Sequence, residues 1–153
     1  MLSFNLFIDA DSSPVKKETI LIAERHDIRT FVVSNRGMRP NHNHVTKTVL
    51  VEKGADKAND WVVAKIKKLD IVITSDIALA KRCIEREALV ISHNGFQITK
   101  KNIGLKLASR NLMAEIRSAD PFFTEKGNVF AKHDRIRFLN TLEKIVQTII
   151  KSL

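Results

Sequence analysis

Carboxylates follow apolar, strand-like segments at two distant places in the sequence. Residues 4–8 lead directly into Asp9 and Asp11, and residues 71–74 lead into Asp76. A mostly apolar run of this length is typical of a strand that is buried on both faces. In a parallel sheet such strands end at the same edge, where α/β proteins usually bind ligands. We therefore expect these carboxylates to lie near one another.

A second pair of acids, Asp56 and Asp60, stands at the start of a helical pattern. Because they are four residues apart, they project from the same helix face. Crowded carboxylates repel one another, and Mg²⁺ or Mn²⁺, which prefer oxygen ligands, would stabilise them. An ion held in this way can polarise a phosphoryl oxygen and supply hydroxide, which implies hydrolysis of a phosphodiester or a phosphomonoester. The predicted metal ligands are Asp9, Asp11, Asp56, Asp60 and Asp76, with Asp9, Asp76, Asp56 and Asp60 as catalytic acids and Ser13, Thr74 and Ser75 in support.

A simpler interpretation is that the acids at helix starts, such as Asp56 and Asp76, only cap helices and that Asp60 is a solvated helix residue. Repetition of the pattern at strand ends favours the pocket, but either role is compatible with Asp56 and Asp76 taken singly.

Basic residues outnumber acidic ones, 26 to 17, which leaves a formal charge of +9. Such a balance favours a polyanionic partner, and nucleic acid is the leading class. The residues expected to bind its backbone are Lys16, Arg36, Arg39, Arg110, Arg117 and Arg135.

Other features give weaker signals. The single Cys83 excludes an internal disulfide and is expected to be a small buried residue. The sequence has no apolar run of about 18 residues and no signal-peptide pattern, so we expect a cytoplasmic protein without a membrane partner. His42 and His44 could suggest zinc, but a third ligand is missing and an exposed loop is the better interpretation. His26, His93 and His133 appear isolated.

Strand-like and helix-like segments alternate along the chain, which predicts a single α/β domain over residues 1–153. The expected architecture is a three-layer sandwich with a mostly parallel central sheet and a C-terminal amphipathic helix packed on it. Asn94 and Gly95 allow a tight hairpin turn into residues 96–98 and, equally, a wider loop. The expected strands are 4–8, 30–33, 48–51, 71–74 and 88–92, and the expected helices are 13–25 (with Ser13 as N-cap), 57–68, 77–86, 101–117 and 132–152, while 34–44 form a loop and 118–131 are irregular.

Taken together, these segments resemble the YaiI/YqxD family (UPF0178, DUF188), small bacterial proteins. The resemblance covers nearly the whole chain. It rests on Ile8-Asp9-Ala10-Asp11 with Pro14-Val15, Gly54-Ala55-Asp56 with Asp60-Trp61, residues 70–77 with Leu79-Ala80, Thr99 with Asn102-Ile103, Leu107-Ala108 with Arg110 and Arg117, and Asp134-Arg135 with Phe138 and Leu142.

The family in turn resembles the PIN-like nuclease fold, in which acids at strand ends bind Mg²⁺ or Mn²⁺ to cleave RNA or DNA. The resemblance implies that Asp9 is the first metal ligand, Asp56 or Asp60 the middle acid, and Asp76 the last. Asp11 and Asn35 would lie close to these three acids. Asn35 is expected to contact nucleic acid.

The sequence departs from the family pattern at several positions. Asn59 alters the usual Ala-Asp register, which leaves the choice between Asp56 and Asp60 open. The other departures are Ser13 for cysteine, Ala78 for proline, a glycine-rich segment reduced to Gly127-Asn128, and His133 for lysine.

Two other functions remain open at this point. A haloacid dehalogenase-like phosphatase would use Asp9 as nucleophile, Asp11 as acid/base, Ser34 for phosphate and Asp76 for Mg²⁺. Pro14, which was expected to open a helix at once, argues against the flap that such phosphatases need. A non-catalytic nucleic-acid-binding module would show the same charge balance. The sequence does not separate RNA from DNA or establish self-association.

Overall fold

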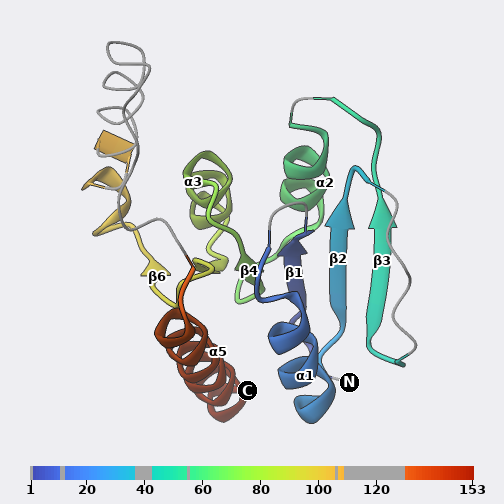
Figure 1. Ribbon diagram of the computed structural model, residues 1–153, viewed down its shortest axis with the longest axis vertical. Coiled ribbons are helices and arrows are strands. Elements are labelled where there is room, and N and C mark those ends of the chain that lie inside the picture. The colour runs from blue at the N-terminus through green and yellow to red at the C-terminus, as the bar shows by residue number, and fades with distance from the viewer. Residues whose placement is uncertain (1, 11–12, 37–42, 55, 106, 109–129) are drawn as a thin grey trace.

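The computed structural model describes residues 2–10, 13–36, 43–54, 56–105, 107–108 and 130–153. Its core is a six-stranded sheet in the order β3-β2-β1-β4-β5-β6 (Figure 1). The first five strands in chain order pair in parallel, and only β5 and β6 are antiparallel. The strands are β1 (Leu6–Asp9), β2 (Thr30–Ser34), β3 (Thr46–Leu50), β4 (Ile71–Ile73), β5 (Leu89–Ile91) and β6 (Gln97–Ile98).

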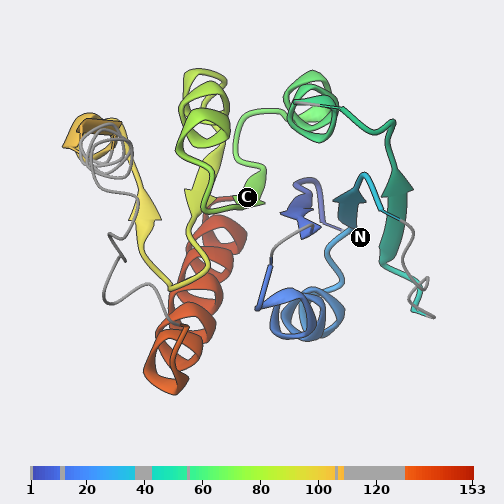
Figure 2. The same ribbon diagram turned by 45° about the horizontal axis from the view of Figure 1, so that its top comes forward.

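Helices cover both faces of the sheet, as Figure 2 shows. They are α1 (Lys16–His26), α2 (Lys57–Lys65), α3 (Ile77–Glu85) and α5 (Lys132–Ser152). Leu6 and Ile8 face the core beneath α1 and α5, whereas Phe7 between them faces α2 and α3. This alternation buries β1 on both sides. The three-layer sandwich and the packed C-terminal helix are therefore confirmed.

The start of α1 differs from the prediction. The helix begins at Lys16, with Val15 at the N-cap position and no side-chain cap. The Ser13 hydroxyl instead accepts a hydrogen bond from the Val15 N–H at 3.4 Å. Val15 is fully buried, so the segment after β1 turns inward before the helix begins. The prediction of Ser13 as N-cap was wrong.

Several other boundaries shift by one to three residues. α2 ends at Lys65 because Ile66 adopts an extended conformation and is buried. β3 begins at Thr46, two residues before the predicted start, since it pairs with the whole of β2.

Of the two connections that the sequence allows here, the wider loop is present, over residues 92–96 between β5 and β6. Gly95 has a φ of +89°, a conformation that favours glycine. A Cβ at this position would lie 2.5 Å from the backbone nitrogen of Phe138 in α5. The loop is also held to this helix by a 2.8 Å hydrogen bond from the Thr141 hydroxyl to the Gly95 carbonyl. Close packing of the loop against α5 thus requires glycine.

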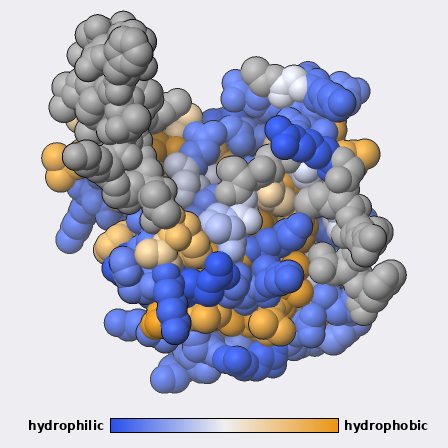
Figure 3. Space-filling model, viewed as in Figure 1, coloured by the Kyte–Doolittle hydropathy of each residue, from blue (hydrophilic) through white to orange (hydrophobic). Residues whose placement is uncertain are grey.

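The remaining predicted segments are described in part. Residues 103–105 and 107–108 are helical, within the helix predicted over 101–117. The rest of that helix from residue 109 and the irregular segment up to residue 129 lie outside the described residues. Hydrophilic side chains cover much of the face in Figure 3. Among the described residues, no helix is long and apolar enough to cross a membrane.

Candidate functional site at the strand ends

The sheet reverses its winding between β1 and β4, which are neighbours near its centre. From β1 the chain passes through α1 to β2, and from β4 it passes through α3 to β5 on the other side. α1 and α3 cover opposite faces of the sheet. In open α/β sheets, ligands bind beyond the carboxyl ends of the strands at such a reversal. The ends of β1 and β4 are thus the expected location of a site.

Asp9 and Asp76 are connected at this point through Thr74. Ile8 pairs with Ile73, so the residues that follow them emerge side by side. The buried Thr74 hydroxyl donates a 3.0 Å hydrogen bond to Oδ2 of Asp9 and accepts a 3.0 Å bond from the Asp76 N–H. The prediction that the two strands end at one edge is confirmed.

Asp76 caps α3 and also faces α2. Its Oδ1 accepts hydrogen bonds from the Ala78 and Leu79 N–H groups at 2.9 and 3.2 Å. Its Oδ2 accepts a 3.1 Å bond from the Asn59 side-chain amide. The positive end of the helix dipole favours a carboxylate here. The capping and pocket interpretations of Asp76 are therefore compatible. We call Asp9, Asn59, Thr74 and Asp76 the strand-end site.

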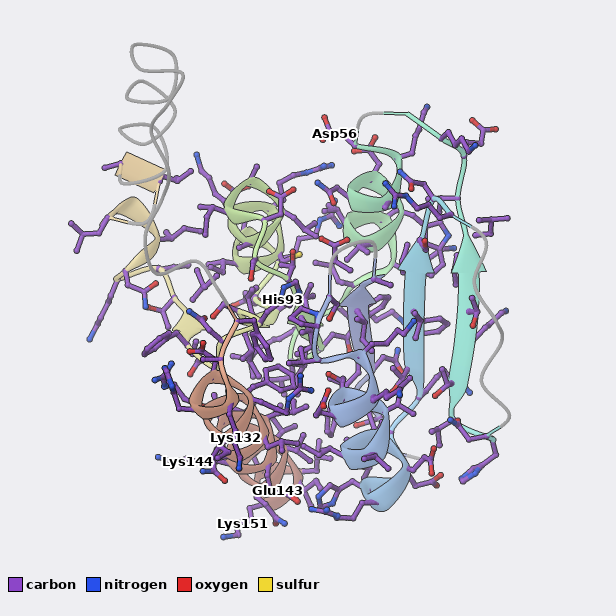
Figure 4. The ribbon with its side chains drawn as sticks, viewed as in Figure 1. Asp56, His93, Lys132, Glu143, Lys144 and Lys151 are labelled. Atoms are coloured by element: carbon purple, nitrogen blue, oxygen red, sulfur yellow. The ribbon has the colours of Figure 1, made fainter. Side chains whose placement is uncertain are left out.

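The two acids predicted on α2 are placed differently. Asp60 forms a 2.9 Å ion pair with Arg82 of α3, and both side chains are substantially exposed. Asp56 is exposed at the N-terminus of α2, with a φ of +65° and no capping hydrogen bond from its side chain. Figure 4 shows Asp56 at the outer end of the helix. The residue that α2 contributes to the strand-end site is Asn59. The sequence marked this residue only as a departure from the family pattern and did not indicate its contact with Asp76.

In the described part of the chain, no three or more acidic, histidine or cysteine side chains come together in a group that could hold a metal ion. Asp11 lies outside the described residues. Metal binding by the remaining pair, Asp9 and Asp76, stays a prediction.

His93 is a further residue at this edge that sequence reasoning left isolated. It follows β5, the neighbour of β4, and its N–H donates a 3.2 Å hydrogen bond to the Ser75 hydroxyl. The residue is 8% exposed, and its buried Nε2 atom has no hydrogen-bond partner among the described residues. Burial lowers the pKa of His93 to about 4. Figure 4 shows it between α3 and β1. The signal was Ser92-His93 after an apolar strand, which parallels Ser75-Asp76 after β4.

The predicted nucleic-acid-binding residues divide into several groups. Arg36 is exposed just beyond β2, where its N–H donates to the Ser34 hydroxyl. Asn35 lies beside it, and Lys16 begins α1. Arg135 forms an ion pair with Glu18 of α1, and its guanidinium lies 5.0 Å from the centre of the Phe130 ring. Arg39, Arg110 and Arg117 lie outside the described residues.

Three histidines have acidic partners. His26 is not isolated as predicted, because its Nε2 lies 2.6 Å from Glu143 of α5. Burial opposes ionisation of Glu143, but hydrogen bonds from Arg25 and His26 outweigh it and lower its pKa. His44 forms a 2.8 Å ion pair with Asp27, and His133 lies 3.6 Å from Asp134. His26 and Glu143 therefore join α1 to α5, while His42 lies outside the described residues.

A groove of about 380 Å³ lies away from the strand-end site. It is lined by α5 together with Leu89 and Gln97 of the β5–β6 hairpin. None of the strand-end residues borders it.

Comparison with known proteins identifies the family. The sequence family described as "Uncharacterized BCR, YaiI/YqxD family" matches residues 7–148. A UPF0178 protein of Roseobacter denitrificans is 48% identical over 93% of this chain and 94% of its own length. A UPF0178 protein of Ruegeria pomeroyi is 45% identical over 93% of this chain and 93% of its own length. A UPF0178 protein of Parvibaculum lavamentivorans is 44% identical over 94% of this chain and 94% of its own length. No solved structure matches the chain significantly, so the likeness to the PIN-like fold stays a prediction. The chain belongs to the YaiI/YqxD family.

Proposed function

We propose that this protein hydrolyses phosphodiester bonds of RNA or DNA at the strand-end site, with Mg²⁺ or Mn²⁺ as cofactor. The observation that carries the proposal is the link from Asp9 through Thr74 to Asp76, at the point where the sheet reverses. The Thr74 hydroxyl joins the Asp9 carboxylate to the backbone N–H of Asp76, so the ends of two neighbouring strands are tied together.

The donor set fits a small divalent cation. Mg²⁺ is commonly held by one or two carboxylates and completes its shell with water and substrate phosphate. Asp9 and Asp76 would hold the ion. When bound, it would act as a Lewis acid on a phosphoryl oxygen. Thr74 orients both acids, because its hydroxyl contacts the side chain of one and the backbone of the other.

A polyanionic substrate agrees with the charge of the chain. The formal charge is +9, and Lys16 and Arg36 lie at the same sheet edge as the acids. Basic residues at the rim offset the repulsion between phosphates and carboxylates. This argument supports nucleic acid as the substrate class without separating RNA from DNA.

The test is cleavage of single-stranded RNA and DNA with Mn²⁺ by the natural protein and by Asp9→Asn and Asp76→Asn. Asparagine keeps an oxygen that can accept the Thr74 bond or cap α3, while it removes the charge. We expect each change to lower cleavage by about 100-fold or more, the size associated with loss of one electrostatic group at a reacting centre. Glu85→Gln removes an exposed acid at the far end of α3 and should leave cleavage unchanged.

The same assay separates the other functions. A small phosphate ester is included, and turnover with a covalent adduct on Asp9 would favour the phosphatase. If the natural protein and both variants bind polynucleotide and none of them cleaves it, the non-catalytic module is favoured. Cleavage by Asp9→Asn at the natural rate would refute the proposal.

A further inference from the structure

The side chain through which α2 reaches the strand-end site is a carboxamide. The Asn59 amide donates to Oδ2 of Asp76 at 3.1 Å, whereas the next residue, Asp60, pairs with Arg82 at 2.9 Å. Consecutive helix residues point about 100° apart. The helix therefore turns an uncharged group toward the site and directs its carboxylate to a neighbouring guanidinium.

Within the described residues, this arrangement brings two carboxylates, those of Asp9 and Asp76, to the site. Both oxygens of Asp76 already accept N–H groups, two from the α3 backbone and one from Asn59. A cation that approaches Oδ2 must compete with the Asn59 amide. No third acid of the described chain joins Asp9 and Asp76 in a group that could hold a metal.

We propose that Asn59 makes cation binding at this site depend on the phosphate substrate. This inference rests on the proposed function. A carboxylate at position 59 would complete a set of three acids, and the cation would then bind to the protein alone. With Asn59 the missing negative charge comes from a backbone phosphate, so cation and polynucleotide bind together.

The coupling must act in both directions. If polynucleotide raises the affinity for the cation by some factor, the cation raises the affinity for polynucleotide by the same factor. Asn59 is thus a positioning residue that acts through Asp76.

The experiment measures Mn²⁺ binding by calorimetry, without turnover. The protein is titrated alone and after saturation with hydrolysis-resistant oligonucleotides, one a 2′-O-methyl RNA and one a phosphorothioate DNA. We expect at least one oligonucleotide to tighten Mn²⁺ binding by tenfold or more. Asn59→Asp should bind Mn²⁺ alone at least tenfold more tightly than the natural protein and respond less to the oligonucleotide.

A matched control is Asn140→Asp. It makes the same change of charge at an exposed position on α5, so it should bind Mn²⁺ as the natural protein does. If Asn140→Asp tightened Mn²⁺ binding as much as Asn59→Asp, net charge alone would explain the effect and the inference would be overturned.

The failures of the two proposals are distinguishable. Equal Mn²⁺ affinity with and without both oligonucleotides in the natural protein overturns the inference, while Asp9-dependent cleavage would still support the nuclease. Absence of Mn²⁺ binding from every protein, with or without oligonucleotide, overturns both. Coupled binding without cleavage supports the role of Asn59 and limits the site to a binding module. Mn²⁺ titrations of the natural protein, with and without oligonucleotide, test the coupling even if Asn59→Asp does not fold.

Discussion

Protonation of His93 should destabilise the folded chain. The residue is buried at the end of β5, and within the described part of the chain its Nε2 atom has no hydrogen-bond acceptor that would stabilise the protonated ring. Burial lowers its pKa from 6.5 to about 4. The unfolded chain therefore takes up a proton at a higher pH than the folded chain.

The sign and size of the effect follow from this difference in pKa. Above about pH 6.5 His93 is neutral in both states and its full contribution to stability is present. Between about pH 6.5 and pH 4 only the unfolded chain binds the proton, so the free energy of unfolding decreases as the pH falls. The total corresponds to about 3 kcal/mol, of which about 2 kcal/mol is lost between pH 7 and pH 5.

Three carboxyl groups also change the stability with pH. Hydrogen bonding lowers the pKa of Asp134 and of Glu143, so their contributions are lost as the carboxylates protonate below their ordinary range. Burial raises the pKa of Asp70, which acts in the opposite direction because the folded chain then binds the proton more readily. The natural protein and a His93 variant both carry these groups, so the difference between the two proteins isolates the contribution of His93.

The assay is urea unfolding at pH 7 and pH 5, followed by the fluorescence of Trp61, the only tryptophan, which contacts Phe7 and Phe31. His93→Gln should reduce the loss of stability between the two pH values by about 2 kcal/mol. His133→Gln, at an exposed position, is the matched control and should behave like the natural protein. If His93→Gln loses as much stability as the natural protein, burial of a neutral His93 is refuted as the cause.

Two further predictions concern the core. Gly95→Ala should lower the free energy of unfolding by about 2 kcal/mol or more, because it combines a positive φ with a clash against Phe138. Thermal unfolding measures this loss. Gly104→Ala is the control, because a Cβ at position 104 meets no atom within 4 Å. Cys83 should resist iodoacetamide at pH 8 in the folded chain and react in concentrated urea, because burial raises the pKa of its thiol to about 12; rapid labelling of the folded chain, followed by mass spectrometry, would contradict this.

The position of Asp9 and Asp76 was predictable because it depends on local sequence and one general rule. Residues 71–73 are all apolar, which indicates a strand with helices on both faces. Parallel strands then place their ends at a common edge. The bounds of α5, residues 132–152, were also predicted correctly, because its apolar positions recur with helical spacing over 21 residues.

The direction of the α2 side chains was not predictable in the same way. The spacing of Asp56 and Asp60 fixes that they share a face, but not which face turns toward the strand ends. Packing of Val62, Val63 and Ile66 against the sheet sets that rotation. The pairing of His26 with Glu143 has the same origin, since it joins residues 117 positions apart through the packing of α1 on α5.

The double role of Asp76 determines which substitutions are informative. Its carboxylate closes the first turn of α3 and also receives Asn59. Asp76→Ala would remove the cap, at a cost of about 1 kcal/mol, together with the charge. Lost activity would then report on the start of α3 as much as on chemistry. Asp76→Asn retains a cap acceptor, so lost activity in a variant of unchanged stability would reflect the missing charge and separate the capping role from the proposed role in catalysis.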